Sequence, residues 1–458
     1  MKEKLKKVLK TYAGEFNLQG INLGLVKDGK KEIVSVGYRD IENKLPMEKD
    51  TIYAIGSQTK AFTAVALGKL LYENGYNFDT PIKDLYDDFK MAEEYRTNDL
   101  RIRDGFSHRT GFPPHLAAWY NNNFKEPKEF LEILKYLPFT MPLRHTFCYQ
   151  SFFFIMGGLI IEKLSGKTFG EYLKENIFDV LGMKNTYILG SLAPDNNKAI
   201  PYEFVEGEYK PMSYNYEFTK YPNGSGTIYS TMEDMQKWIE FWLNGNEKII
   251  DRKIQAKIIS PQMIIEVDES QPQVPYTTNY TYGMGWYLKN YRGFNIVEHG
   301  GIVDGFRAFH VFVPEKNLAV SIVTNLNEAQ GTELIAYSLI DEVLGYERDW
   351  QEEYIKKFKT YLEKNESADL KLDQLKEKDF SKYLGKYKDK AYGEFEFIED
   401  EGKLFVLAFS HKIEVKENKG QKYIVFKPYN LSIAINFEKD KLILNIDEKT
   451  RVEINREK

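Results

Sequence analysis

The spacing of apolar residues predicts both helices and strands in the first 345 residues. Apolar positions recur every three or four residues in several segments, the period of a helix with one buried face. These predicted helices are 60–71, 130–137, 154–164, 232–243 and 334–344. Short β-branched or alternating runs predict strands at 21–26, 33–38, 286–288, 309–313 and 319–324. Strands at both ends with helices between them predict one mixed α/β domain closed by its N- and C-terminal parts.

The N-terminal residues 1–10 are basic, but their apolar residues return at helical spacing. This pattern predicts an amphipathic surface helix rather than a signal peptide. The most apolar stretch, 152–161, is about half the length needed to cross a bilayer, so it predicts a buried helix. We therefore expect a cytoplasmic protein without a membrane partner.

The composition changes after Gly345. Residues 347–379 are dominated by Lys, Glu and Asp, which predicts a solvated helical connector. The alternating runs beyond it predict a small antiparallel β-barrel or sandwich. These runs are 394–398, 404–409, 413–416, 423–427, 431–437, 442–446 and 452–454. The expected division is a first domain over 1–350, a connector over 351–375 and a barrel over 376–458.

Composition excludes several classes of protein. The net charge is −5, from 63 Lys and Arg against 68 Asp and Glu, so no basic excess indicates a nucleic-acid partner. A single cysteine, Cys148, excludes an intramolecular disulfide and suits a reducing compartment. The six histidines form no metal-binding pattern, and we expect neither a metal nor another cofactor.

The first candidate for chemistry is Ser57, followed three positions later by Lys60 at the start of a predicted helix. Both side chains would project from one face of that helix, one turn apart. A serine hydroxyl needs a base to become a nucleophile, and a lysine whose pKa is lowered by burial can be that base. Taken alone, the pair is also compatible with a helix cap and a surface lysine.

Further blocks accompany this pair in a particular order. They are 53–64 around Ser57, Ser107–Pro113, Phe147–Ser151, Asn223–Met235, Tyr282–Trp286 and His299–Gly301. Together they resemble the serine β-lactamase and penicillin-binding-protein superfamily, and within it the class C, CubicO-group peptidases and esterases. The resemblance covers residues 20–340 approximately. It implies a β-lactamase/transpeptidase-like α/β (α+β) fold with an antiparallel sheet flanked by helices.

The resemblance also implies roles for individual residues. Ser57 would be the acylated nucleophile, Lys60 its base or proton shuttle, and Tyr149 a second base and the acid for the leaving group. His299 would lie beside a substrate carboxylate or the proton path of Tyr149.

The oxyanion hole is expected from the backbone N–H groups of Ser57 and Ile302, with Ile302 on a strand entered after Gly301. Gly300 and Gly301 would allow the backbone to approach a substrate closely. One position departs from the family pattern, because Ser151 stands where Tyr-x-Asn is usual. A hydroxyl cannot replace the donor and acceptor of an amide, so processing of β-lactams is in doubt.

The motif Tyr383–Tyr387 and the strands after it resemble the lipocalin-like domain of some archaeal and bacterial CubicO-group peptidases. We expect this barrel to contact the catalytic cleft or a neighbouring subunit, and the protein to form a homo-oligomer. The predicted activity is hydrolysis of amide bonds in small peptides, including peptides with D-amino acids. An esterase, a β-lactamase and a ligand-binding sensor without turnover stay open as alternatives.

Overall fold

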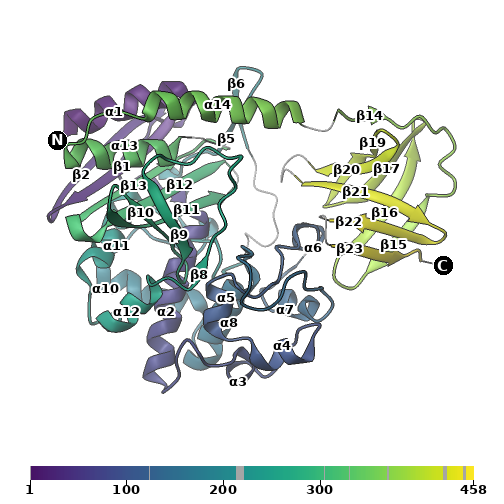
Figure 1. Cartoon of the computed structure of the whole chain (residues 1–458), viewed down its shortest axis with the longest axis horizontal. Helices are drawn as coiled ribbons and strands as arrows, with labels where there is room; N and C mark the ends of the chain where they lie inside the picture. Colours follow the sequence, from purple (N-terminus) through teal and green to yellow (C-terminus); the bar gives the residue numbers. More distant parts are fainter. Residues whose placement is uncertain are drawn as a thin grey trace.

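A computed structural model describes residues 2–122, 124–212, 221–303, 305–327, 329, 331–368, 371–426, 431–446 and 450–457. The first part of the chain is built on a nine-stranded antiparallel sheet (Figure 1). In spatial order the strands are β3 (Leu45–Pro46), β2 (Lys30–Asp40), β1 (Gly20–Lys27), β13 (Leu318–Thr324), β12 (Phe306–Val313), β11 (Phe294–Val303), β10 (Tyr287–Tyr291), β9 (Thr277–Tyr282) and β8 (Met263–Ile264). Since β1 pairs with β13, the two ends of this part meet in one sheet, as predicted.

Helices cover both faces of this sheet (Figure 1). On one face, α13 (Thr332–Leu344) packs on β12 and β13, and α1 (Lys2–Glu15) packs on β2 and on α13. On the other face, α11 (Met232–Asn244) lies against β1 and β13. Each face has its own cluster of buried apolar side chains. The prediction of a mixed α/β fold is therefore confirmed.

A helical layer lies beyond α11 and contains most of the remaining helices. Its central pair is α2 (Thr59–Glu73) and α8 (Phe152–Ser165), which pack against each other and are buried on nearly all sides. The others are α3 (Ile82–Leu85), α4 (Glu94–Asp99), α5 (Ile102–Phe106), α6 (Leu116–Asn121), α7 (Glu129–Leu134), α9 (Phe169–Leu173), α10 (Asp179–Leu181) and α12 (Arg252–Ile258). Among all described residues, no helix has the length and apolarity required to span a membrane.

Short strand pairs lie outside the main sheet. They are β4 (Tyr53–Ala54) with β7 (Tyr229–Ser230), and β5 (Tyr202–Val205) with β6 (Glu208–Pro211). The pairing of β4 with β7 brings the residues before Ser57 beside those that follow Asn223.

The C-terminal part is an antiparallel β-barrel made of two sheets, as predicted. One sheet is β15 (Gly385–Asp389), β16 (Gly393–Asp400), β17 (Lys403–Ala408) and β18 (His411–Glu414). The other is β14 (Asp373–Gln374), β19 (Lys416–Asn418), β20 (Gln421–Phe426), β21 (Leu431–Glu438), β22 (Lys441–Asn445) and β23 (Arg451–Asn455). A bridge between Tyr387 and Arg456 joins the two sheets at one edge, and β18 lies against β20 at the other. The rings of Tyr387, Phe397 and Phe437 pack together inside.

The connector is helical, as its charge predicted, but one side of the helix is packed rather than solvated. Helix α14 (Gln351–Ala368) follows a buried Trp350 and turns Tyr354 toward the first part of the chain. Phe358 makes an edge contact with Phe16, whose ring centroid lies 6.3 Å away. The helix is therefore amphipathic, and one face belongs to the same apolar cluster as α1 and α13. Its sparse apolar residues, spaced four apart, carry this contact.

Candidate active site

Ser57 and Lys60 lie at the N-terminal end of the most deeply buried helix. Ser57 sits in a single 3₁₀ turn (Gly56–Gln58) that continues directly into α2. Lys60 Nζ lies 3.0 Å from Ser57 Oγ and donates a second hydrogen bond of 3.0 Å to the backbone carbonyl of Ser225. The spacing of three residues therefore places both groups on one face, as predicted.

The environment of Lys60 makes it a candidate base. Its side chain is completely buried, and burial lowers its pKa to about 7. Roughly half of the molecules then carry a neutral amine at pH 7, because at the pKa both forms are equally populated. A neutral amine at hydrogen-bond distance can accept the proton of the Ser57 hydroxyl.

Tyr149 completes this arrangement from the segment just before α8. Lys60 Nζ lies 5.0 Å from the centroid of the Tyr149 ring, and the phenol is hydrogen-bonded to Ser57. Burial raises the pKa of Tyr149 above its usual value. The hydroxyl is therefore protonated at neutral pH and can act as a proton donor, whereas Lys60 is the better acceptor.

The loop around His108 packs against Tyr149 and is hydrogen-bonded to its neighbours in sequence. The ring centroids of His108 and Tyr149 are 4.3 Å apart. The backbone N–H of Cys148 donates to the His108 carbonyl at 2.7 Å, and that of Gln150 donates to His108 Nδ1 at 3.3 Å. Burial lowers the pKa of His108, so its imidazole is neutral. His108 therefore shapes the loop that carries Tyr149.

His299 lies on β11, which differs from the sequence expectation of a strand entered only after Gly301. Its Nδ1 donates to the carbonyl of Gly300 at 2.5 Å, which leaves Nε2 to accept the hydroxyl of Tyr282 at 2.9 Å. Burial lowers the pKa of His299 to about 3, so the ring is neutral at neutral pH. Its centroid is 6.3 Å from that of Tyr149. At rest His299 is thus a neutral, hydrogen-bonded group beside Tyr149.

Close backbone packing joins β11 to the turn that carries Ser57. Gln58 Nε2 donates to the His299 carbonyl at 3.3 Å. A Cβ atom on Gly301 would lie 1.9 Å from the carbonyl oxygen of Ile55, and one on Gly56 would lie 2.7 Å from the backbone nitrogen of Ile302. Only glycine allows this approach, which brings the backbone of Ile302 beside that of Ser57.

Gly301→Ala is expected to reduce kcat/KM by about 10²-fold, because the added methyl group must push β11 away from this turn and displace the Ile302 N–H expected to bind the oxyanion. Gly14→Ala, with no atom within 4 Å of the new Cβ, is the matched control. Steady-state hydrolysis and thermal melts of both variants check this. Parent-like activity in folded Gly301→Ala would show that this close approach does not matter.

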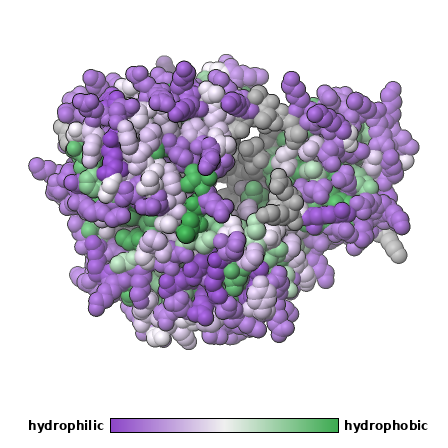
Figure 2. Space-filling view, viewed as in Figure 1, coloured by the Kyte–Doolittle hydropathy of each residue, from purple (hydrophilic) through white to green (hydrophobic). Residues whose placement is uncertain are grey.

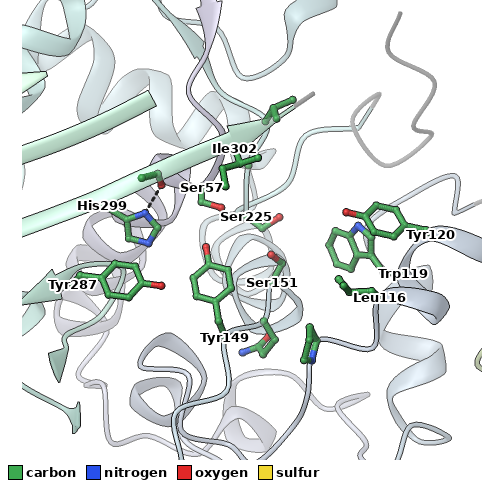
Figure 3. A pocket seen from close by; sticks show the side chains of 15 residues that line it. Ser57, Leu116, Trp119, Tyr120, Tyr149, Ser151, Ser225, Tyr287, His299 and Ile302 are labelled. Carbon is green, nitrogen blue, oxygen red and sulfur yellow. Dashed lines mark hydrogen bonds between the residues drawn. The ribbon is translucent and has the colours of Figure 1, made fainter. Parts of the chain in front are cut away.

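A cavity of about 510 Å³ opens in front of Ser57 (Figure 3). Its fifteen lining residues are Ser57, Pro114, Leu116, Trp119, Tyr120, Tyr149, Gln150, Ser151, Ser225, Gly226, Tyr287, His299, Gly300, Ile302 and Val303. None of these described residues carries a formal charge at neutral pH, and four of them are large aromatic side chains. Such a cavity suits a neutral acyl group with an apolar or aromatic side chain.

The structure brings together every residue that the sequence proposed for the site. Six of the eight line the cavity, Lys60 lies beneath Ser57, and Gly301 lies against Ile55. Sequence reasoning missed the roles of Ser225 and Tyr282, although both fall inside motif blocks that it had singled out. It also missed one wall of the cavity, formed by Leu116, Trp119 and Tyr120 of α6. No local pattern distinguishes that helix from ordinary core.

Comparisons with known proteins agree with this geometry. Residues 5–344 match the family described as Beta-lactamase. The unguisins hydrolase ungD' of Aspergillus campestris is 28% identical over 354 residues, 74% of this chain and 64% of that protein. The chain thus spans less than two thirds of that relative's length.

Two solved structures share the fold. The octameric penicillin-binding protein homologue from Pyrococcus abyssi has a TM-score of 0.68 at 21% identity, with 99% of both chains covered. The D-amino acid amidase from Ochrobactrum anthropi has a TM-score of 0.62 at 21% identity, covering 75% of this chain and 99% of that one. The first of these therefore matches the C-terminal part of the chain as well as the large sheet.

Proposed function

The chain belongs to the beta-lactamase family, whose members are serine hydrolases, and on this premise we propose that it forms an acyl-enzyme on Ser57 and cleaves amide bonds of small peptides. The observation that carries this proposal is the buried amine of Lys60, 3.0 Å from Ser57 Oγ. A protein that only binds a ligand has no use for a base held in contact with a hydroxyl, so this pair argues against a sensor without turnover.

The proposed reaction follows from the protonation states of the site. Lys60 accepts the proton of Ser57 while Oγ attacks the carbonyl carbon of the substrate. The N–H groups of Ser57 and Ile302 stabilise the resulting oxyanion. Tyr149 donates its proton to the leaving nitrogen, and the ammonium of Lys60 returns a proton to Tyr149. In the second half-reaction, Lys60 accepts a proton from water as the water attacks the ester carbonyl. Lys60 then returns this proton to Ser57 Oγ as the bond to the acyl group breaks and the acid leaves.

The lining of the cavity supports a substrate class. Its uncharged, aromatic wall favours neutral acyl groups, and the neutral His299 offers no cation for a carboxylate. Ser151 lacks the amide that the family uses to position a substrate. Peptide amides, including those of D-amino acids, are therefore favoured over carboxylate-bearing β-lactams. The D-amino acid amidase and the unguisins hydrolase among the similar proteins support this choice.

We also propose the finer assignments for the whole chain. These are the CubicO group, a catalytic domain over 1–350, a connector over 351–375 and a lipocalin-like domain over 376–458. A homo-oligomer with contacts through the barrel is supported by the fold shared with an octameric homologue over 99% of the chain. A cytoplasmic location is supported by the single cysteine.

Labelling with a fluorophosphonate tests the proposed function. The full chain should acquire one covalent adduct, and peptide mass spectrometry should place it on Ser57, because this is the hydroxyl with a base beside it. D-phenylalanine amide should slow the labelling by occupying the cavity, whereas a chromogenic cephalosporin should do so less. An adduct on another residue, or hydrolysis by folded protein that the probe never labels, would contradict the proposal.

A further inference from the structure

Helix α6 forms one wall of the cavity and also carries the contact with the C-terminal barrel. Leu116, Trp119 and Tyr120 stand at positions i, i+3 and i+4, so they share one face of the helix. Figure 3 shows this face across the cavity from His299 and Tyr287. In Figure 1 the same helix lies between the helical layer and the barrel. Any movement of α6 therefore changes the space beside Ser57.

The C-terminal end of α6 is hydrogen-bonded to the barrel through Asn121. Its Nδ2 donates to the carbonyls of Tyr392 and Glu394, at 2.7 and 3.0 Å. Its Oδ1 accepts the backbone N–H of Phe409 at 2.6 Å. The next residue, Asn122, donates to the carbonyl of Ala391 at 2.8 Å. One amide side chain thus joins α6 to the start of β16 and to the turn between β17 and β18.

The N-terminal end of α6 reaches the same segment of the barrel through His115. Nε2 of His115 donates to the carbonyl of Pro138 at 2.9 Å, so Nδ1 accepts the hydroxyl of Tyr392 at 2.9 Å. Both ring positions are therefore used, one toward the helical layer and one toward the barrel. His115 has a φ of 45°, in the left-handed region that a histidine adopts rarely, and these two bonds hold it there.

Apolar contacts hold the middle of this helix. Six residues are too short for a helix that is stable by itself, and its middle is held by Trp119, which packs on Phe130 and Phe152. A second cavity, of about 430 Å³, lies beside Asn121 and is lined otherwise by barrel residues. The hydrogen bonds of His115, Asn121 and Asn122 therefore tie both ends of α6 to the barrel.

We propose that Asn121 and His115 are positioning residues through which the barrel determines which acyl groups the cavity accepts. The inference rests on the proposed acylation of Ser57. A large acyl group must contact Leu116 and Tyr120, whereas an acetyl group can react at Ser57 without reaching α6. Releasing either end of α6 therefore weakens binding of large acyl groups and leaves the chemistry at Ser57 unchanged.

The experiment compares two esters with the same leaving group, 4-nitrophenyl acetate and 4-nitrophenyl 3-phenylpropanoate, on the full-length protein. Asn121→Asp replaces two donors with an acceptor facing two carbonyls, and Tyr392→Phe removes only the hydroxyl bound to His115. Each should lower the ratio of kcat/KM for the large ester to that for acetate by about 10-fold, mainly through KM. Asn436→Asp, the same substitution on the outside of the barrel, is the control and should leave the ratio unchanged.

The outcomes separate failure of the role of the barrel from failure of the proposed function. If both variants hydrolyse the two esters in the parent's ratio while Ser57 is still labelled by a fluorophosphonate, the role of the barrel is overturned and the proposed function stands. If the parent acquires no adduct on Ser57, the proposed function itself fails. Should Asn121→Asp not fold, Tyr392→Phe alone decides, because it removes one oxygen atom and keeps the buried ring.

Discussion

Replacing Ser57 with alanine is expected to lower kcat/KM for an amide substrate by at least about 10⁴-fold. The substitution removes only Oγ, the atom that would form the acyl bond and that lies 3.0 Å from Lys60 Nζ. Neither the turn Gly56–Gln58 nor the backbone donor of Ser57 depends on this hydroxyl, so the cavity should keep its shape. The variant should bind substrate and not turn it over, and mass spectrometry should find no adduct after fluorophosphonate treatment.

Ser165→Ala is the matched control for this substitution. Ser165 lies at the end of α8, where its hydroxyl accepts the backbone N–H of Lys167 and lies away from the cavity. This variant should keep the parent's kcat/KM and its labelling by the probe. If Ser57→Ala retained more than about a tenth of the parent's activity, another nucleophile would have to be sought.

The fold could be read from the sequence wherever one apolar face was continuous. The spacing in 60–71, 154–164, 232–243 and 334–344 falls within α2, α8, α11 and α13. The helix predicted over 130–137 ends earlier, at Leu134, with Pro138 following it. The part of strand β11 before Gly301 was missed because Asn295, Glu298 and the two glycines interrupt its apolar pattern. Of these residues, only Gly300 and Gly301 lie at the site, whereas Asn295 bonds to Glu315 and Glu298 pairs with Lys289.

In the barrel, the apolar pattern predicts strands but does not show where one strand ends and the next begins. The run predicted over 413–416 is two strands, β18 and β19, and the change between them falls at Val415. Val415 is buried, and its N–H donates to the carbonyl of Leu404. The alternation of apolar residues continues through such a bend, so the pattern could not reveal it.

The residues of the candidate site differ in whether the sequence could identify them. Ser57 and Lys60 are three residues apart on one helix, so their contact follows from local geometry. Tyr149 and His299 were identified only by resemblance to a family. Neither local spacing nor the family resemblance pointed to the wall formed by α6. Asn121 in this helix bonds to residues more than 270 positions further along the chain. Contacts at such separation depend on how the two parts pack, which no local pattern records.

Lys60→Met is expected to lower kcat/KM by about 10³-fold, because methionine fills the same buried space without a group that accepts a proton. The fold should tolerate the change, since burial disfavours the charged form of Lys60 and an apolar side chain avoids that cost. Thermal melting should therefore show a midpoint at or above that of the parent. Lys69→Met, also on α2 but ion-paired with Glu73, is the control and should hydrolyse substrate as the parent does.

The pH dependence of the parent gives an independent test of the same role. The base form of Lys60 is the neutral amine, so kcat/KM should rise with pH through a pKa of about 7 and then level off. At pH 5 the rate should be roughly 100-fold below the plateau, because two pH units below the pKa leave about 1% of the amine neutral. Neutral His299, with its pKa lowered to about 3, and Tyr149, with its pKa raised, should add no further step between pH 5 and 9. Stopped assays across this range would reveal the profile. A rate that stays constant from pH 5 to 9 would mean that Lys60 does not accept the proton of Ser57, whatever the activity of Lys60→Met.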